Sequence, residues 1–174
     1  MNYVLVMTEG KVELEFLKLS QDRNLLIFEE KSLLFEDMYH ARQLDGKLLN
    51  YIQQTSFDSK IIIYRIGDKM TDELKISPKL IKTKIESQVK VCTLPEFEIL
   101  LIINENLKKE FDKSQKKASE FIKSKFKTNT KQSGFVSKYF GSMSDAEIIN
   151  LLKRYSELKK NPKDCLTLYD LIKK

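Results

Sequence analysis

The stretch YVLVMTEGKVELEFLKLS, residues 3–20, indicates a buried strand that passes directly into a helix. Residues 3–7 form an apolar run rich in β-branched and aromatic side chains, which is typical of a strand covered on both faces. From residue 9 to residue 19, apolar side chains recur at the spacing of one helix face. Glu9 and Gly10 stand at the join, so we expect Gly10 to permit a tight turn and Glu9 to lie at the end of the strand.

Further apolar runs indicate three more strands. The strongest is KIIIYRI, residues 60–66, which Gly67 and Asp68 follow directly, and weaker strands are predicted at residues 25–28 and 89–93. Strands that alternate with helices favour a parallel α/β sheet, in which ligand sites lie at the carboxyl ends of the strands. We therefore expect the carboxylates of Glu9 and Asp68 to meet at one edge of the sheet.

The second half of the chain is helical in pattern. From Pro95 onward the sequence contains no credible strand. In the first half, apolar spacing suggests one further helix around residues 44–52. Residues 144–158 have the best helix signals, with Ser144 as N-cap and Glu147 in the capping-box position, and a short terminal helix is predicted at residues 165–172.

These signals predict an α/β protein with a mostly parallel four-stranded sheet flanked by helices, followed by a helical C-terminal extension. The 174 residues suffice for one core of ordinary domain size. We expect residues 1–107 to form the α/β core and residues 108–174 to form a lysine-rich helical extension packed on it.

The charge distribution favours an acidic partner such as nucleic acid. The formal net charge is +6, and lysines concentrate between residues 108 and 131, where acids are few. The lysines expected to contact phosphates are Lys11, Lys113, Lys116, Lys117, Lys123, Lys125 and Lys127. Phe111, Phe121 and Phe126 interleave with them, and we expect at least two of these rings to pack on the core instead of stacking on bases. A basic composition without functional meaning is the alternative.

The cysteines and the start of the chain predict a soluble, cytoplasmic protein. Cys92 and Cys165 lie far apart and have no CxxC partner, so neither a zinc site nor a disulfide framework is indicated, and reduced thiols are expected. The first residues have no basic segment of a signal peptide, and no apolar run approaches the length of a membrane span.

Acidic residues at two strand ends are the usual basis of a magnesium site on an α/β sheet. Mg²⁺ prefers hard oxygen ligands and keeps several waters, so two or three carboxylates suffice and substrate phosphates complete its coordination shell. Such a metal stabilises charge on a phosphate and lowers the pKa of the attacking water. Glu9 and Asp68 are the candidate ligands at the strand ends.

Three segments resemble a known family. VLVMTEG (residues 4–10) and IIIYRIGDKMTDE (residues 61–73) resemble the Toprim domain of topoisomerases, primases and related nucleases, which has Glu-Gly after its first strand and Asp-x-Asp after a later one. TLPEFEILLIINENL (residues 93–107) is similar to the Asn-Pro-x-Phe-Glu-x-Trp segment of RloB-like Toprim proteins, which are associated with phage defence and restriction. Met70 stands where the second Asp of the Toprim motif is expected, and the next acid is Asp72.

The resemblance implies hydrolysis of phosphodiester bonds in DNA or RNA with Mg²⁺ or Mn²⁺. Glu9 would act as general base or would position the water or the leaving group, and Asp68 with Asp72 would hold the metal beside Glu9. Glu98 would be an accessory ligand or an orienting group, and Glu13, one helical turn after Glu9, would join the cluster. A companion ATPase subunit and a homo-oligomer are further partners that the resemblance leaves open.

Other interpretations stay open for each acid and for the whole protein. Glu9 and Asp72 could instead be residues at the start of a helix, where acids are favourable. Asp68 could be an ordinary turn residue, and Glu98 could be a buried glutamate with a pairing partner. The alternative function is a catalytically inactive Toprim-like module that binds nucleic acid or a protein. A phosphotransferase is less favoured, because the chain has neither GxxxxGK[ST] nor GxGxxG, and His40, the only histidine, excludes a site built on two histidines.

Overall fold

The protein folds around one parallel sheet of four strands in the order β2-β1-β3-β4. The structure is a computed structural model that describes residues 2–56, 58–68, 73–127, 129–130, 132, 134–158 and 165–174. The strands are β1 (Asn2–Thr8), β2 (Tyr39–His40), β3 (Lys60–Gly67) and β4 (Ile85–Cys92). The helices are α1 (Lys11–Asp22), α2 (Gly46–Gln54), α3 (Pro78–Thr83), α4 (Ile99–Asn104), α5 (Lys108–Ser114), α6 (Ala118–Phe126), α7 (Phe135–Tyr139) and α8 (Asp145–Leu158). Short 3₁₀ helices span Glu30–Ser32, Leu34–Glu36 and Leu168–Leu171.

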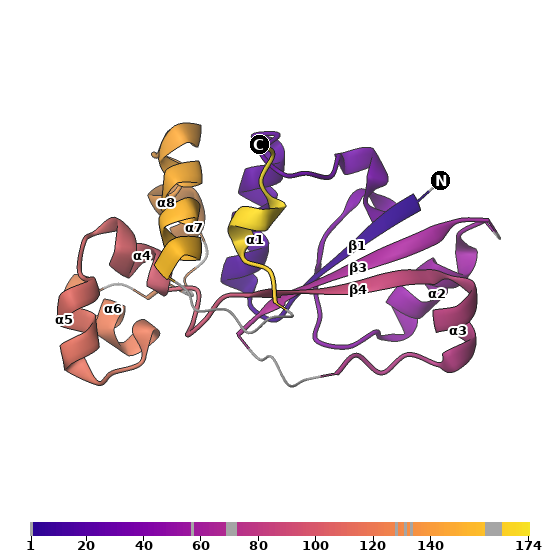
Figure 1. Cartoon of the computed structure of the whole chain (residues 1–174), viewed down its shortest axis with the longest axis horizontal. Coiled ribbons are helices and arrows are strands. Elements are labelled where there is room, and N and C mark those ends of the chain that lie inside the picture. Colours follow the sequence, from indigo (N-terminus) through magenta and orange to yellow (C-terminus); the bar gives the residue numbers. More distant parts are fainter. Residues whose placement is uncertain are drawn as a thin grey trace.

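Helices cover both faces of the sheet, because successive side chains of a strand point to opposite sides. On one face, Val6 of β1 belongs to a large hydrophobic cluster with Phe16 of α1 and with side chains of α4, α6 and α8. On the other face, Leu5 of β1 and Ile63 of β3 pack with Ile52 of α2. Figure 1 shows α1 and α2 on opposite sides of the strands. The result is a three-layer arrangement with two separate apolar cores.

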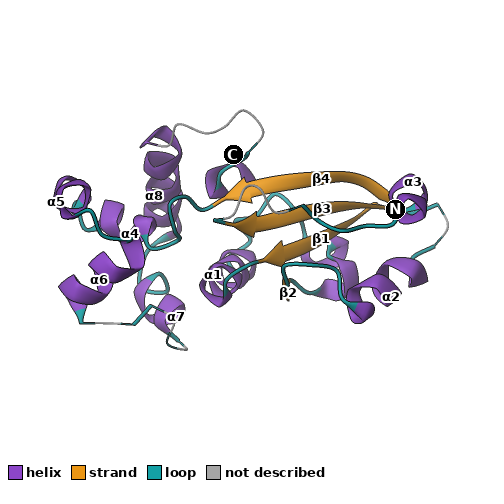
Figure 2. Ribbon diagram, turned by 90° about the horizontal axis from the view of Figure 1, so that it is seen from below, coloured by secondary structure: helices purple, strands orange, loops and turns teal. Residues whose placement is uncertain are grey.

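Helices α4 to α8 lie beyond the carboxyl ends of the strands, as Figure 2 shows. Tyr155 of α8 connects this helical part to the sheet, because its buried hydroxyl lies 3.0 Å from the carbonyl oxygen of Cys92 and 3.1 Å from that of Leu94. The large cluster includes side chains from both sides of the expected boundary at residues 107 and 108, among them Ile102 and Leu151. The boundary itself stays a prediction.

The fold class predicted from the sequence is confirmed: the protein is α/β, with a four-stranded parallel sheet, flanking helices and a helical C-terminal part. The predicted helices after Glu9, around residues 44–52 and at residues 144–158 correspond to α1, α2 and α8. The capping box of α8 is formed, since the Glu147 carboxylate accepts from Ser144 N–H at 2.7 Å and Ser144 Oγ accepts from Glu147 N–H at 3.3 Å.

The strand predicted at residues 25–28 is wrong, because this segment lies outside the four-stranded sheet. Its backbone pairs with the C-terminal segment: Ile27 N–H donates to Leu171 O at 2.9 Å and Lys173 N–H donates to Leu25 O at 2.8 Å. The place beside β1 is taken by β2, which has only two residues. A strand this short has no alternation of apolar and polar side chains that a sequence pattern could reveal.

Two other boundaries differ from the prediction. β4 begins at Ile85, earlier than the predicted residue 89, because Ser87 and Gln88 are exposed and interrupt the apolar pattern at the start of the strand. The predicted terminal helix at residues 165–172 is reduced to the 3₁₀ helix Leu168–Leu171, because Leu166 instead pairs with β4.

The expectation of reduced cysteines is also wrong, because the structure joins Cys92 and Cys165 in a disulfide. Leu166 N–H donates to Lys90 O at 2.9 Å and Cys92 N–H donates to Leu166 O at 2.9 Å, so the C-terminal segment runs along the outer edge of β4. This pairing places the Cα atoms of the two cysteines 6.0 Å apart, within the range of disulfides. The long separation in sequence concealed the proximity.

Candidate active site

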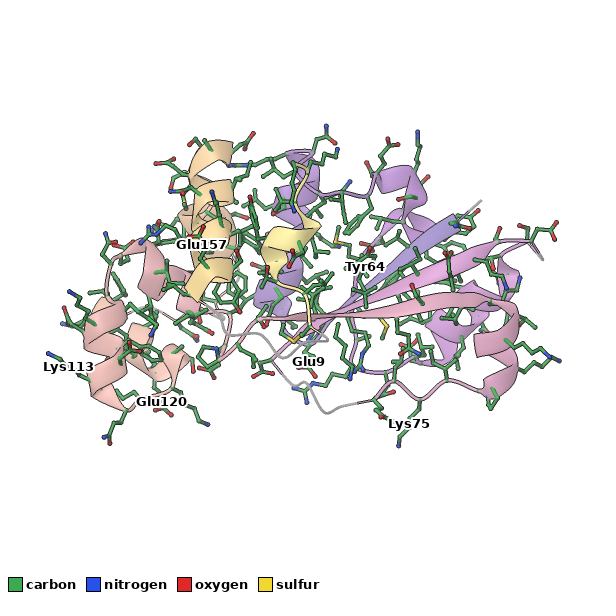
Figure 3. The ribbon with its side chains drawn as sticks, viewed as in Figure 1. Glu9, Tyr64, Lys75, Lys113, Glu120 and Glu157 are labelled. Carbon is green, nitrogen blue, oxygen red and sulfur yellow. A yellow bond between two sulfur atoms is a disulfide. The ribbon has the colours of Figure 1, made fainter. Side chains whose placement is uncertain are left out.

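A pocket of about 330 Å³ opens at the carboxyl end of the sheet. We call it the acid pocket, and the predicted acids that line it are Glu9, Glu13, Asp68 and Glu98. Figure 3 shows Glu9 near the carboxyl ends of the strands, where the sheet meets the helical part. The structure therefore brings together four of the five acids that the sequence singled out. The fifth, Asp72, lies outside the described residues.

Glu9 is held where β1 and β3 end side by side. Its backbone N–H donates to Ile66 O of β3 at 2.9 Å, and Nε2 of His40 lies 2.9 Å from its carbonyl oxygen. The Glu9 side chain occupies the space above Gly67, where a Cβ atom would lie 2.4 Å from Glu9 Oε2. The glycine at the end of β3 thus makes room for the carboxylate at the end of β1.

Gly10 has a similar relation to Glu13, and this corrects the role predicted for it. Its φ of −111° and ψ of 149° are extended backbone angles that any residue adopts, so the turn does not require glycine. A Cβ atom on Gly10 would instead lie 2.0 Å from Glu13 Oε2. Glycine leaves the space that the Glu13 carboxylate occupies, and a Cβ atom here would displace that carboxylate.

Glu13 is buried at the wall of the acid pocket and has an unusual pKa. Burial raises the pKa of Glu13 to about 6, and the negative charges of Glu98 and Asp68 add to the rise. A hydrogen bond from its own backbone N–H and a 3.4 Å hydrogen bond from Thr93 Oγ1 to Oε1 partly oppose it. Glu13 therefore holds its proton to a higher pH than an ordinary glutamate does.

Glu98 and Glu96 connect the acid pocket to the helices beyond the sheet. The buried Glu98 immediately precedes α4, and its Oε1 accepts a 2.6 Å hydrogen bond from the hydroxyl of the buried Thr130. Glu96 accepts hydrogen bonds at the first turn of α6, from Ser119 N–H at 2.9 Å and from Ser119 Oγ at 3.2 Å. These contacts hold α6 against the pocket.

The donor chemistry of the acid pocket suits a magnesium ion. Glu9, Glu13 and Asp68 offer carboxylate oxygens, and a cation would offset the negative charges that these side chains bring into one pocket. In the described part of the chain, however, no group of three or more His, Cys, Asp or Glu side chains is arranged to hold a metal ion. A metal here would take most of its coordination from water and from substrate phosphates, as Mg²⁺ commonly does.

The predicted lysines fall into two groups. Lys11 lines the acid pocket, and Lys116 and Lys117 line an adjoining groove of about 410 Å³. The other predicted lysines are exposed on α5 and α6 or just after α6 and are not among the residues that line either hollow: Lys113, Lys123, Lys125 and Lys127. Figure 3 shows Lys113 pointing outward, away from Glu9.

Two of the interleaved phenylalanines have packing contacts, and one of them, Phe111, also lines the adjoining groove. Phe111 and Phe121 contact each other edge to face, with ring centroids 5.5 Å apart, and Phe121 is buried. Phe126 keeps 40% of its surface exposed. At least two of the three rings therefore pack within the helical part.

Three ionisable side chains that line the acid pocket were not among the predicted site residues, namely His40, Arg42 and Glu96. His40 and Arg42 lie at and just after β2, whose two residues carry no recognisable strand pattern. Glu96 had a signal, because it stands two residues before Glu98 in the segment PEFE.

Within the described residues, no helix combines the length and the apolar character needed to cross a membrane. Comparison with models of protein families, with curated proteins and with solved structures finds no match to this chain.

Proposed function

We propose that this protein is a Mg²⁺-dependent nuclease of the Toprim type, similar to RloB-like proteins, that cleaves phosphodiester bonds of DNA or RNA in the cytoplasm as part of phage defence. One observation carries the proposal: Glu9, Glu13, Asp68 and Glu98 converge in one pocket at the carboxyl ends of a parallel sheet. Carboxylates gathered at this edge are the arrangement used for metal-assisted chemistry on phosphates.

The side chains have distinct roles in this proposal. Glu9, at the end of β1, accepts the proton of the attacking water, and Glu13, in the wall of the same pocket, positions the leaving oxygen, which takes its proton from solvent. Lys11 and Arg42 line the same pocket and contact the scissile phosphate. When bound near Asp68, Mg²⁺ would stabilise the charge that develops on the phosphate.

Replacement of the central carboxylates tests the proposal. Glu9→Gln and Asp68→Asn keep the size of each side chain, and we expect each to lower the rate of DNA or RNA cleavage at least about 100-fold, because each removes a group that acts at the reacting phosphate. Cleavage of labelled single-stranded and duplex DNA and RNA is measured with Mg²⁺ and with Mn²⁺. Glu157→Gln, on the exposed face of α8, is the matched control and should cleave like the wild type. Undiminished cleavage by the double variant Glu9→Gln, Asp68→Asn would contradict the proposal.

An inactive Toprim-like binding module is the second candidate, and the exposed lysines of α5 and α6 are compatible with it. Calorimetric titration with Mn²⁺ separates the two candidates. A nuclease should bind the metal in a manner that Glu9→Gln weakens, whereas an inactive module that binds nucleic acid should show neither metal binding at Glu9 nor cleavage. A companion ATPase subunit and self-association stay predictions.

A further inference from the structure

A second hollow, lined in part by lysines, lies next to the acid pocket. This lysine groove is lined by Asp68, Pro95, Glu96, Phe111, Gln115, Lys116, Lys117 and Ala118. Asp68 and Glu96 line both hollows, so the lysine groove adjoins the acid pocket. A chain bound in the groove would therefore lead directly to the candidate site of cleavage.

The lysines of the groove are presented by the turn between α5 and α6. Gln115 ends α5 with a φ of 55°, in the left-handed region, and Lys116 N–H donates to Ser114 Oγ at 3.3 Å. On the other side of the turn, the hydrogen bonds from Ser119 to Glu96 fix the start of α6 beside the acid pocket. Glu96 is thus hydrogen-bonded to α6, and the exposed Lys116 and Lys117 line the same groove as Glu96.

An aromatic ring forms part of the same groove. Phe111 is partly buried, and its edge-to-face contact with Phe121 at 5.5 Å fixes its orientation. Aromatic side chains next to cationic side chains are the combination that binds single-stranded nucleic acids, because bases stack on the ring while the cations follow the phosphates. The bases of a duplex have their faces covered by neighbouring pairs and gain nothing from such a ring.

We propose that the lysine groove binds a single-stranded segment of nucleic acid next to the phosphate that is cleaved. Lys116 and Lys117 contact backbone phosphates, and Phe111 stacks on one base. The position of the cleaved phosphate rests on the proposed nuclease activity, whereas the binding of a single strand in the groove does not. It names single-stranded DNA or RNA, or a single-stranded region of a longer molecule, as the substrate class.

Charge reversal in the groove tests the phosphate contacts. The double variant Lys116→Glu, Lys117→Glu is compared with Lys113→Glu, Lys123→Glu, which changes the net charge equally on exposed lysines outside the groove. Binding to a fluorescein-labelled single strand of about 20 nucleotides, long enough for the known site sizes, is measured by anisotropy in EDTA. We expect the groove variant to bind at least about tenfold more weakly and the slope of log K against log salt to become shallower by about 1.4, for two lost phosphate contacts. Equal loss in both variants would overturn the inference.

A second set of variants tests the stacking contact. Phe111→Leu keeps most of the packing against Phe121 and should weaken single-strand binding about tenfold, whereas Phe111→Tyr keeps an aromatic face and should bind like the wild type. Phe126→Leu, at an exposed ring outside the groove, is the control. Equal affinity for a duplex of the same length, or no effect of Phe111→Leu, would overturn the inference.

Hydrolysis of bis(p-nitrophenyl) phosphate with Mn²⁺ separates this inference from the proposed function. That substrate is too small to need the groove, so the groove variants should hydrolyse it at the wild-type rate. If the groove variants bind single strands more weakly but the wild type hydrolyses nothing, the result supports the groove and contradicts the nuclease. Hydrolysis together with unaffected single-strand binding in the groove variants would support the nuclease and contradict the groove.

Discussion

At the scale of single residues, two glycines define the candidate site by leaving space. A Cβ atom on Gly67 would lie 2.4 Å from Glu9 Oε2, and one on Gly10 would lie 2.0 Å from Glu13 Oε2. Both distances are shorter than Cβ atoms tolerate, so each carboxylate would have to leave its position if a methyl group were added. The glycines follow strand ends, where a turn is the usual explanation, but here the adjacent carboxylates explain them better.

Gly67→Ala is the sharpest test of this relation. We expect it to displace the Glu9 carboxylate and to lower cleavage about 100-fold, the effect of misplacing a catalytic group by about 1 Å. Gly46→Ala is the matched control, since a Cβ atom added at Gly46 would have nothing within 4 Å and both changes restrict the unfolded chain equally. Cleavage rates and thermal unfolding are measured for both variants. Full activity of Gly67→Ala would show that the position of Glu9 is not critical.

Glu13 predicts a pH-dependent stability that can be measured without any substrate. Its pKa is about 6 in the folded protein and 4.5 in the reference state, so the folded state holds the proton more tightly, and stability is lost as the pH rises from about 4.5 to about 6. This difference corresponds to about 2 kcal/mol. Glu13→Gln removes the ionisation, so the variant should be more stable than the wild type by up to about 2 kcal/mol at pH 7 and equal to it at pH 4.

Urea denaturation of both proteins at pH 4 and pH 7 measures this difference. Glu157→Gln, at an exposed position, should show the same stability as the wild type at both values. A Glu13→Gln protein that is less stable than the wild type at pH 7 would mean that the buried carboxylate stabilises the fold in its charged form. If Glu13→Gln also cleaves more slowly than the wild type, the gain in stability with a loss of activity would be typical of a functional site.

At the scale of elements, long regular segments were predictable and short ones were not. β3 has eight residues with a continuous apolar run, and α8 has a capping box and an apolar face, so local signals sufficed for both. β2 has two residues and exists only because its backbone pairs with Met7 and Thr8 of β1. The segment at residues 25–28 was predicted as a strand because it is apolar, but an apolar run alone does not show which segment it pairs with.

The acids of the site were predictable for the same reason as the strands that carry them. Glu9 and Asp68 directly follow recognisable strands, and the ends of parallel strands meet at one edge. Arg42 and His40 were not predicted because their positions depend on the pairing of β2. The sequence also could not show which lysines line the groove and which do not. That division depends on the turn between α5 and α6 and on the hydrogen bonds of Glu96.

At the scale of the whole molecule, the C-terminal segment ties the helical part back to the sheet. Leu166 pairs with β4, Cys165 bonds to Cys92, and Leu171 pairs with Ile27. Cys92 is followed by Thr93, whose hydroxyl donates to Glu13, so this link ends beside the acid pocket. The order of β4 at the candidate site therefore depends on residues from the far end of the chain.

The disulfide predicts a measurable loss of stability on reduction. Its cysteines are 73 residues apart in sequence, and the chain-entropy relation gives about 4 kcal/mol for a loop of this size. Dithiothreitol should lower the free energy of unfolding in urea by that amount, with no effect on the Cys92→Ala, Cys165→Ala variant. Alkylation of thiols during cell lysis then reports the state in the cell. Disulfides are rare in the cytosol, so two free thiols would agree with the cytoplasmic location and would contradict a disulfide in the cell.

The sequence by itself determined the α/β class, the strongest strands and the acids that follow them, because these depend on local apolar periodicity and on residues adjacent to it. Only the tertiary structure decided that Glu13 and Glu98 share the pocket with Glu9, that Gly10 and Gly67 make room for carboxylates, and that Cys92 meets Cys165. The physical reason is that these relations join segments distant in sequence through backbone pairing and close packing. Backbone pairing and close packing between distant segments leave no pattern in the sequence of either segment alone.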